Sequence, residues 1–150
     1  PAQALEHSNG RALVATGSPF EPVTWDSQAR AIGQCNNAFV FPGVGLGVLI
    51  SEASHVTEAL FLAAANCLAE FTSAQELWNG ALYPSLSHLR QISQAIGLRV
   101  AQTAREVGLG RTLDDEAIET TLREFMWWPD YPCSPRPKNG EREAADGPAG

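Results

Sequence analysis

Apolar residues recur at helical spacing in three stretches that follow residue 56. The first stretch runs over residues 57–71, the second over 85–108, and the third from about 112 to just before Pro129. A repeat of three to four residues predicts an amphipathic helix with one face in the core. The expected core positions are Leu60, Ala63, Ala64, Cys67, Leu68 and Phe71, then Leu89, Ile92, Ile96, Val100, Ala104 and Val107, and finally Ile118, Leu122 and Phe125.

Small polar residues and prolines predict where the helices begin. Thr57 is expected to cap the first helix, with Glu58 near its positive end. Thr112 with Asp115 resembles a capping box, in which each side chain binds a backbone N–H of the first turn. Pro42 is expected in the first turn of a further helix, because a backbone donor is not needed there.

The beginning of the chain has shorter apolar runs separated by turn residues. Residues 2–7 are expected to end a helix, and residues 11–16 to form a buried strand of a parallel sheet. Residues 21–33 are expected to be a polar connection. Ligands of doubly wound sheets bind beyond the carboxyl ends of the strands. Gly17 and Ser18, which follow the predicted strand, are therefore expected near a pocket.

Three glycines stand at alternate positions, Gly43, Gly45 and Gly47. Each costs a helix about 1 kcal/mol relative to alanine, a penalty accepted where another backbone approaches closely. They do not form the dinucleotide fingerprint Gly-x-Gly-x-x-Gly, because Val48 occupies the place of the third glycine. We expect all three to be packing residues.

Composition narrows the functional classes. The chain has 150 residues, 44% of them hydrophobic and 18% charged, which is typical of one soluble globular domain. A net charge of −7 argues against nucleic-acid binding, because phosphates would be repelled. The apolar run of residues 38–50 is shorter than the roughly 18 residues that a membrane helix needs. We expect neither nucleic acid nor a membrane as partner.

The three cysteines, Cys35, Cys67 and Cys133, are odd in number and far apart. This spacing favours reduced thiols in the cytoplasm over a disulfide framework or a zinc site. Cys67 is expected in the core. Catalysis by Cys35 is disfavoured, since the sequence places no base beside it.

The adjacent amides Asn36 and Asn37 are the candidate chemistry of the chain. They lie where an irregular segment meets an apolar, glycine-rich helix. Their carboxamides can hydrogen-bond a carboxylate or a ribose without carrying charge. Asparagine also caps helix termini by accepting from backbone N–H groups. Residue type alone leaves both roles open.

Residues 10–20 (GRALVATGSPF), 34–47 (QCNNAFVFPGVGLG) and 82–84 (LYP) together resemble the C-terminal quarter of a malic enzyme, from about Pro1 to Trp128. The resemblance implies an α/β fold: the C-terminal part of a Rossmann-like, doubly wound NAD-binding domain, followed by mainly helical segments. Residues 1–36 would end the NAD-binding domain, and 37–110 would be helices packing back on the catalytic core. Residues 111–128 would form a C-terminal helix, and 129–150 a flexible tail.

The same resemblance implies oxidative decarboxylation of (S)-malate to pyruvate and CO2 with NAD and a divalent metal, Mg²⁺ or Mn²⁺. It implies that Asn36 and Asn37 contact malate, and that Asn36, with Gly17 and Ser18, lies near the cofactor. The family's acid, base and metal ligands match none of these residues, so the chain alone is expected to be inactive. The Cys35 form of the motif is similar to the bacterial, NAD-using branch. Expected partners are malate, NAD, the remaining malic enzyme domains and further copies in a homo-oligomer.

Two alternatives stay open. The chain begins at Pro1 without a methionine, which together with the resemblance favours a piece of a longer protein. It would otherwise be a non-catalytic helical interaction module derived from the family. The aromatic cluster of Trp127, Trp128 and Tyr131 would dock either on a neighbouring subunit or on its own domain.

Overall fold

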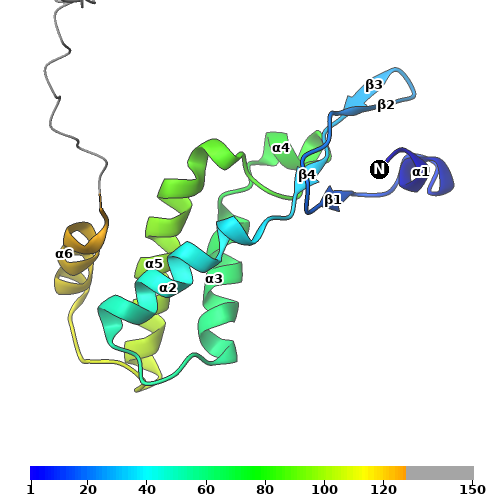
Figure 1. Ribbon diagram of the computed structural model, residues 1–150. Helices are drawn as coiled ribbons and strands as arrows, with labels where there is room; N and C mark the ends of the chain where they lie inside the picture. The colour runs from blue at the N-terminus through cyan, green and yellow to red at the C-terminus, as the bar shows by residue number, and fades with distance from the viewer. Residues whose placement is uncertain (128–150) are drawn as a thin grey trace, which may run out of the picture.

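A computed structural model describes residues 1–127 of the chain. Two regions lie side by side in Figure 1. The N-terminal region, residues 1–34, contains α1 (Ala2–His7), β1 (Ala15–Thr16), β2 (Val23–Trp25), β3 (Gln28–Arg30) and β4 (Gly33–Gln34). The helical region, residues 37–127, contains η1 (Asn37–Phe39), α2 (Phe41–Ser51), α3 (Glu58–Glu70), α4 (Ala74–Trp78), η2 (Leu86–His88), α5 (Leu89–Glu106) and α6 (Asp115–Phe125).

The long helix α5 organises the helical region, because α2, α3 and α6 all pack against it. Its apolar stripe is buried as predicted, with Ile92, Ile96, Val100 and Ala104 inaccessible to solvent. They form a core with the following residues of the other helices: Phe39, Val44, Leu60, Ala64, Cys67 and Leu68. A smaller cluster consists of Ile50, Ala101, Ile118 and Leu122. The predicted helices and most of their core faces are therefore confirmed.

The ends of these faces were predicted wrongly. Val107 is 49% exposed and Phe125 is 56% exposed. Ala63 is only partly buried, whereas Phe71 and Leu89 are partly buried and pack against the core as predicted. Val107 lies beyond the last helical residue of α5, and Phe125 is the last residue of α6, so both lie at the ends of the packed faces.

Gly43 and Gly47 of α2 form a glycine seam against α5. A Cβ at Gly43 would lie 2.6 Å from Cβ of Ile96, and one at Gly47 would lie 2.6 Å from Cβ of Val100. These separations are shorter than van der Waals contact, so only glycine fits at both positions. Gly45 has no atom within 4 Å of its would-be Cβ. The packing role is confirmed for Gly43 and Gly47 and was wrong for Gly45.

Two predicted helix caps differ from the structure. Thr57 occupies the N-cap position of α3, but its hydroxyl makes no capping hydrogen bond. Asp114, rather than Thr112, caps α6, because its side chain accepts from the N–H of Ala117 at 2.8 Å. The capping box of Thr112 and Asp115 therefore does not form. Pro42 lies in the first turn of α2 as predicted.

The N-terminal region combines a parallel and an antiparallel strand pair. β1 pairs with β4 in parallel, and β2 pairs with β3 as a hairpin. The predicted strand over residues 11–16 is reduced to Ala15–Thr16, and it is half-buried rather than buried, with Leu13 62% exposed. The predicted connection over 21–33 contains the hairpin, whose turn residues Asp26 and Ser27 have φ of 48° and 62°.

Helix α4 was not predicted. It is five residues long and is opened by a capping box, in which Ser73 accepts from the N–H of Glu76 and the Glu76 carboxylate accepts from the N–H of Ser73. The N–H and the hydroxyl of Ser73 both donate to the Glu76 carboxylate, at 2.8 and 2.7 Å, and hold the pKa of Glu76 below its usual value. Within residues 1–127, no helix is long and apolar enough to cross a membrane. The expected tail, 129–150, and two members of the aromatic cluster, Trp128 and Tyr131, lie outside the described residues.

Candidate functional site

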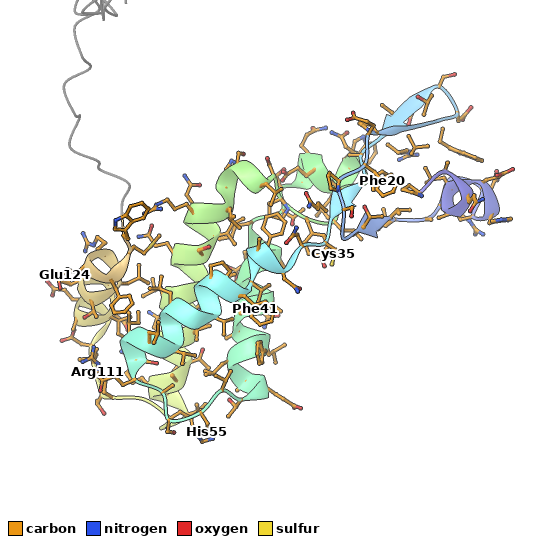
Figure 2. The ribbon with its side chains drawn as sticks, viewed as in Figure 1. Phe20, Cys35, Phe41, His55, Arg111 and Glu124 are labelled. Carbon is orange, nitrogen blue, oxygen red and sulfur yellow. The ribbon has the colours of Figure 1, made fainter. Side chains whose placement is uncertain are left out.

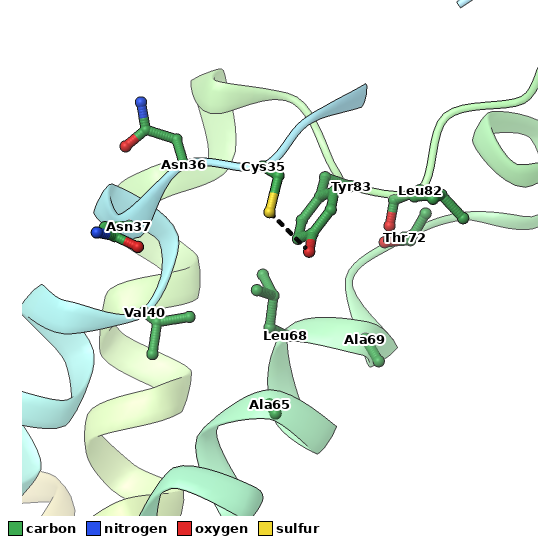
Figure 3. Close-up of a pocket in the computed structure, with 10 residues that line it drawn as sticks. All are labelled: Cys35, Asn36, Asn37, Val40, Ala65, Leu68, Ala69, Thr72, Leu82 and Tyr83. Atoms are coloured by element: carbon green, nitrogen blue, oxygen red, sulfur yellow. Dashed lines mark hydrogen bonds between the residues drawn. The ribbon is translucent and has the colours of Figure 1, made fainter. Parts of the chain in front are cut away.

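A cavity of about 310 Å³ opens where the two regions meet. One wall is the segment that leaves β4, and the opposite wall is the C-terminal half of α3 with the segment that precedes η2 (Figure 3). Its described lining combines amides, hydroxyls and a thiol with small aliphatic side chains: Cys35, Asn36, Asn37, Val40, Ala65, Leu68, Ala69, Thr72, Leu82 and Tyr83. None of these residues is charged, so the cavity suits an uncharged or partly apolar group.

Strand pairing places the amide segment, residues 35–39, at the carboxyl edge of the small sheet. The N–H of Cys35 donates to the carbonyl of Thr16 at 2.8 Å, which continues the β1–β4 ladder by one bond. The Gln34 side chain donates to the carbonyl of Gly17 at 3.4 Å. Both parallel strands therefore end at the same edge, as a doubly wound sheet requires of a binding edge.

Asn36 uses half of its carboxamide as a helix cap. Its Oδ1 accepts from the N–H of Ala38 at 2.9 Å, opening η1 just before α2. The Nδ2 group is not used by this bond and carries two donors. Asn37 is exposed, and Asn36 is half-buried. Figure 3 shows both amide side chains pointing away from the contact between Cys35 and Tyr83.

Tyr83 contacts both ends of the amide segment, Cys35 and Phe39. The thiol of Cys35 donates to its hydroxyl at 3.1 Å. Its ring stacks on Phe39, with centroids 6.1 Å apart and an interplanar angle of 19°. The contact with Cys35, followed by burial, raises the pKa of Tyr83 above its ordinary value of 10.0, so the phenol stays protonated at neutral pH. Burial likewise raises the pKa of the Cys67 thiol in the core.

Of the predicted site residues, Asn36 and Asn37 line the cavity. Gly17 and Ser18 are exposed at the end of β1, and neither belongs to the cavity lining. Ser18 instead accepts a hydrogen bond on its carbonyl from the Thr16 hydroxyl at 2.8 Å. Within residues 1–127, no three His, Cys, Asp or Glu side chains lie close enough to hold a metal ion.

The sequence did not assign a role to Tyr83 or Thr72. Tyr83 belongs to the LYP triplet that carries part of the family resemblance, so a signal was present without an interpretation. Thr72 follows α3 and donates to the carbonyl of Leu82 at 3.4 Å, a contact between segments that no local pattern indicates.

Comparison with known proteins decides the family. Residues 1–105 match the family described as "Malic enzyme, NAD binding domain". The chain belongs to the malic enzyme family. Within it, the chain is 42% identical over 131 residues to the NAD-dependent malic enzymes of Shewanella oneidensis and of Shewanella sp. strain ANA-3. The same identity is found to the enzyme of Shewanella baltica. Each alignment covers 87% of this chain but only 23% of the relative.

These matches confirm the resemblance to bacterial, NAD-dependent malic enzymes and the Rossmann-like origin of the fold. In this malic enzyme segment the observed structure is mixed α/β, mostly helical with a small parallel sheet. The chain spans about a quarter of the length of the curated relatives that it matches.

The donor set at the amide segment fits one part of NAD. The Nδ2 group of Asn36 and the carboxamide of Asn37 are uncharged, which suits the hydroxyls of a ribose or a carboxamide. No cationic side chain belongs to the described lining, so it offers no charged partner for a diphosphate. The residues present therefore fit the ribose and nicotinamide end of the cofactor.

Proposed function

We propose that this chain is part of a malic enzyme that converts (S)-malate to pyruvate and CO2 with NAD and a divalent metal, Mg²⁺ or Mn²⁺. The observation that carries the proposal is the position of Asn36 and Asn37, at the carboxyl edge of the parallel strands and beside the cavity. NAD supplies the hydride acceptor when bound. The catalytic acid, base and metal ligands lie in other parts of the enzyme.

In this proposal the amides hold and orient the substrate. Nδ2 of Asn36 and the carboxamide of Asn37 donate to a malate carboxylate and to the nicotinamide ribose. Because Oδ1 of Asn36 is tied to the N–H of Ala38, the Asn36 side chain is held in one orientation before the substrate arrives. Preorganised uncharged donors bind an anion without competing with the metal for it. Gly17 and Ser18 lie near the cofactor, outside direct contact with malate.

The proposal extends to domain organisation and assembly. Residues 1–36 end the NAD-binding domain, and the chain returns towards the metal-bearing domain at Asn37, which is supported by the change from strands to helices at that point. The partners are malate, NAD, the remaining malic enzyme domains and further copies in a homo-oligomer. A cytoplasmic location is supported by Cys35 and Cys67, which are both free thiols.

Substitutions at Asn36 separate binding from capping in the gene product that contains this chain. Aspartate at this position still accepts from Ala38, so Asn36→Asp keeps the cap but removes the donors and adds a negative charge. We expect KM for malate to rise about tenfold or more, since a lost hydrogen bond to a charged group costs about 1.5–3 kcal/mol. Thermal stability should change little.

Asn36→Ala is the matched control, because it removes both functions. It should raise KM in the same way and lose about 1 kcal/mol of stability. Normal kinetics in Asn36→Asp, together with destabilisation in Asn36→Ala, would show that the residue only caps η1. Residues 1–150 alone should reduce no NAD in the presence of malate and Mn²⁺, and sustained reduction would contradict the assignment of acid, base and metal to other segments.

A non-catalytic interaction module is the second candidate. It is favoured by an exposed aromatic pair, Phe41 of α2 and Phe61 of α3, whose rings meet edge to face with centroids 6.5 Å apart. Leu62 beside Phe61 is 62% exposed. Malate oxidation by the gene product that contains this chain would exclude this candidate.

A further inference from the structure

One side chain contacts both ends of the segment that carries the amides. The hydroxyl of Tyr83 accepts from the thiol of Cys35, which directly precedes Asn36. The ring of Tyr83 stacks on Phe39, the last residue of η1. Asn36 and Asn37 therefore lie in sequence between two residues that share Tyr83 as a neighbour. Figure 3 shows the first of these contacts, between Cys35 and Tyr83.

The two contacts differ in strength and in rigidity. Phe39 is completely buried in the main core, so its ring gives Tyr83 a fixed surface. A stacked aromatic pair contributes about 0.5–1.5 kcal/mol beyond its buried area. The thiol of an exposed cysteine is a weaker donor. The stack therefore fixes the ring, and the hydroxyl then restrains Cys35.

The backbone beside Tyr83 adds a third contact, at β4. A Cβ at Gly33 would lie 3.1 Å from the backbone nitrogen of Leu82 and 3.5 Å from that of Tyr83. The Leu82–Tyr83 backbone thus packs directly on the strand that leads into the amide segment. A methyl group at Gly33 would be tight against the Leu82 backbone, so that one of the two segments would have to shift slightly.

We propose that Tyr83 is a positioning residue that holds Asn36 and Asn37 in their binding orientation by contacting Cys35 and Phe39 at once. The consequence for catalysis rests on the proposed function, because it requires the amides to bind malate. The consequence for local order does not rest on it. Tyr83 acts through the backbone of residues 35–39 and not through a contact of its own with malate or the cofactor.

The first test measures order without substrate, in the gene product that contains this chain. Hydrogen exchange of the Ala38 N–H, which donates to Asn36, reports the geometry of the amide segment. Tyr83→Leu removes the stack and the hydroxyl and should accelerate this exchange about tenfold or more. Tyr83→Phe keeps the stack on Phe39 and loses only the weaker contact with Cys35, so it should stay within about threefold of the parent. Exchange within α6 should not change in either variant, and unchanged exchange at Ala38 in Tyr83→Leu overturns the proposal.

The second test separates positioning from general stability. Tyr83→Leu should raise KM for malate about tenfold or more, raise KM for NAD in the same direction because the amides also contact the nicotinamide ribose, and be largely rescued by Tyr83→Phe. Ile118→Ala, in the cluster between α2, α5 and α6, is the control for a variant of lowered stability. It should lower the melting temperature and leave KM for malate unchanged. If Ile118→Ala and Tyr83→Leu raise KM equally, the effect is structural and the proposal is overturned.

Asn36→Asp in the same assay distinguishes the two levels of failure. If Asn36→Asp raises KM for malate and Tyr83→Leu does not, the positioning role of Tyr83 is overturned while the proposed function stands. If neither variant raises KM, the proposed function fails, and the Ala38 exchange rate alone then decides whether Tyr83 orders the segment.

Discussion

The helical region and the N-terminal region differ in how fully they bury their apolar side chains. In the helical region, α5 is covered on several sides, and its core residues Ile92, Ile96 and Val100 are fully buried. Among residues 1–34, Leu5 is the one hydrophobic side chain in the buried core, while Leu13 and Phe20 are 62% and 51% exposed. Figure 2 labels Phe20 beside the small strands. Helices can cover one another with their apolar faces, whereas strand pairs of two or three residues leave both faces open.

Because of this difference, the helical region provides most of the stability, and the candidate site lies outside its core. The free energy of unfolding comes mainly from the helical region, where apolar area is removed from water. The candidate site lies at the junction, where the small sheet ends and η1 begins. The junction therefore joins a rigid support on one side to a lightly packed segment on the other.

The largest expected contrast is between core side chains of the two regions. Ile96→Ala should lower the free energy of unfolding by about 3 kcal/mol, because it removes buried methyl groups and leaves a cavity. Leu13→Ala should cost less than about 0.5 kcal/mol, because the side chain is already largely in water. Urea denaturation of both variants measures the difference. Equal losses would show that the N-terminal region is as well packed as the helices.

A smaller contrast is expected within α2 alone. Gly47→Ala should cost about 2 kcal/mol, since its methyl group would lie 2.6 Å from Cβ of Val100 and would force α2 away from α5. Gly45→Ala faces open space and should stabilise the helix by about 0.5–1 kcal/mol. The sign of the change in urea midpoint distinguishes them. A loss of stability in both variants would mean that the face of α2 that carries Gly45 is also packed.

The smallest contrast is at the start of α6. Asp114→Ala should cost about 1 kcal/mol, because it leaves the N–H of Ala117 without its capping acceptor. Thr112→Ala should change stability by less than about 0.5 kcal/mol, since Thr112 precedes the cap. Thermal unfolding monitored by circular dichroism resolves the two. A larger loss of stability in Thr112→Ala than in Asp114→Ala would instead support the capping box of Thr112 and Asp115.

Hydrophobic periodicity predicted the helical region well, because apolar residues spaced three to four apart share one face of a helix and that face is buried. The cost of glycine in a helix predicted packing at Gly43, Gly45 and Gly47, which is confirmed at the first and the last. Only the facing residues Ile96 and Val100 show why Gly45 differs. The hairpin of β2 and β3 was missed because Asp26-Ser27 is a weaker turn signal than Asn-Gly. The strand before Gly17 was predicted too long, since apolar residues alone do not fix hydrogen-bonded partners.

At the candidate site, residue types identified Asn36 and Asn37 as candidates. They did not show that the oxygen and the nitrogen of the Asn36 carboxamide can serve different partners. Oδ1 of Asn36 caps η1 while Nδ2 stays available, so the two interpretations of this residue are compatible. The contact between Cys35 and Tyr83 joins residues 48 positions apart, which a single sequence does not reveal. Gly17 and Ser18 were placed by topology and lie at the expected strand end, outside the cavity lining.

The spacing of Gly43 and Gly47 also limits how the chain can change in length. One added residue between them would rotate everything before it by about 100° about the axis of α2. Ile96 and Val100 would then no longer meet both gaps, and either η1 with its amides or the turn after Ser51 would have to leave its place. Insertions and deletions should therefore be tolerated at the tip between β2 and β3. Inside α2 they should disrupt the fold, because the spacing of Gly43 and Gly47 fixes where the segments on either side of α2 lie.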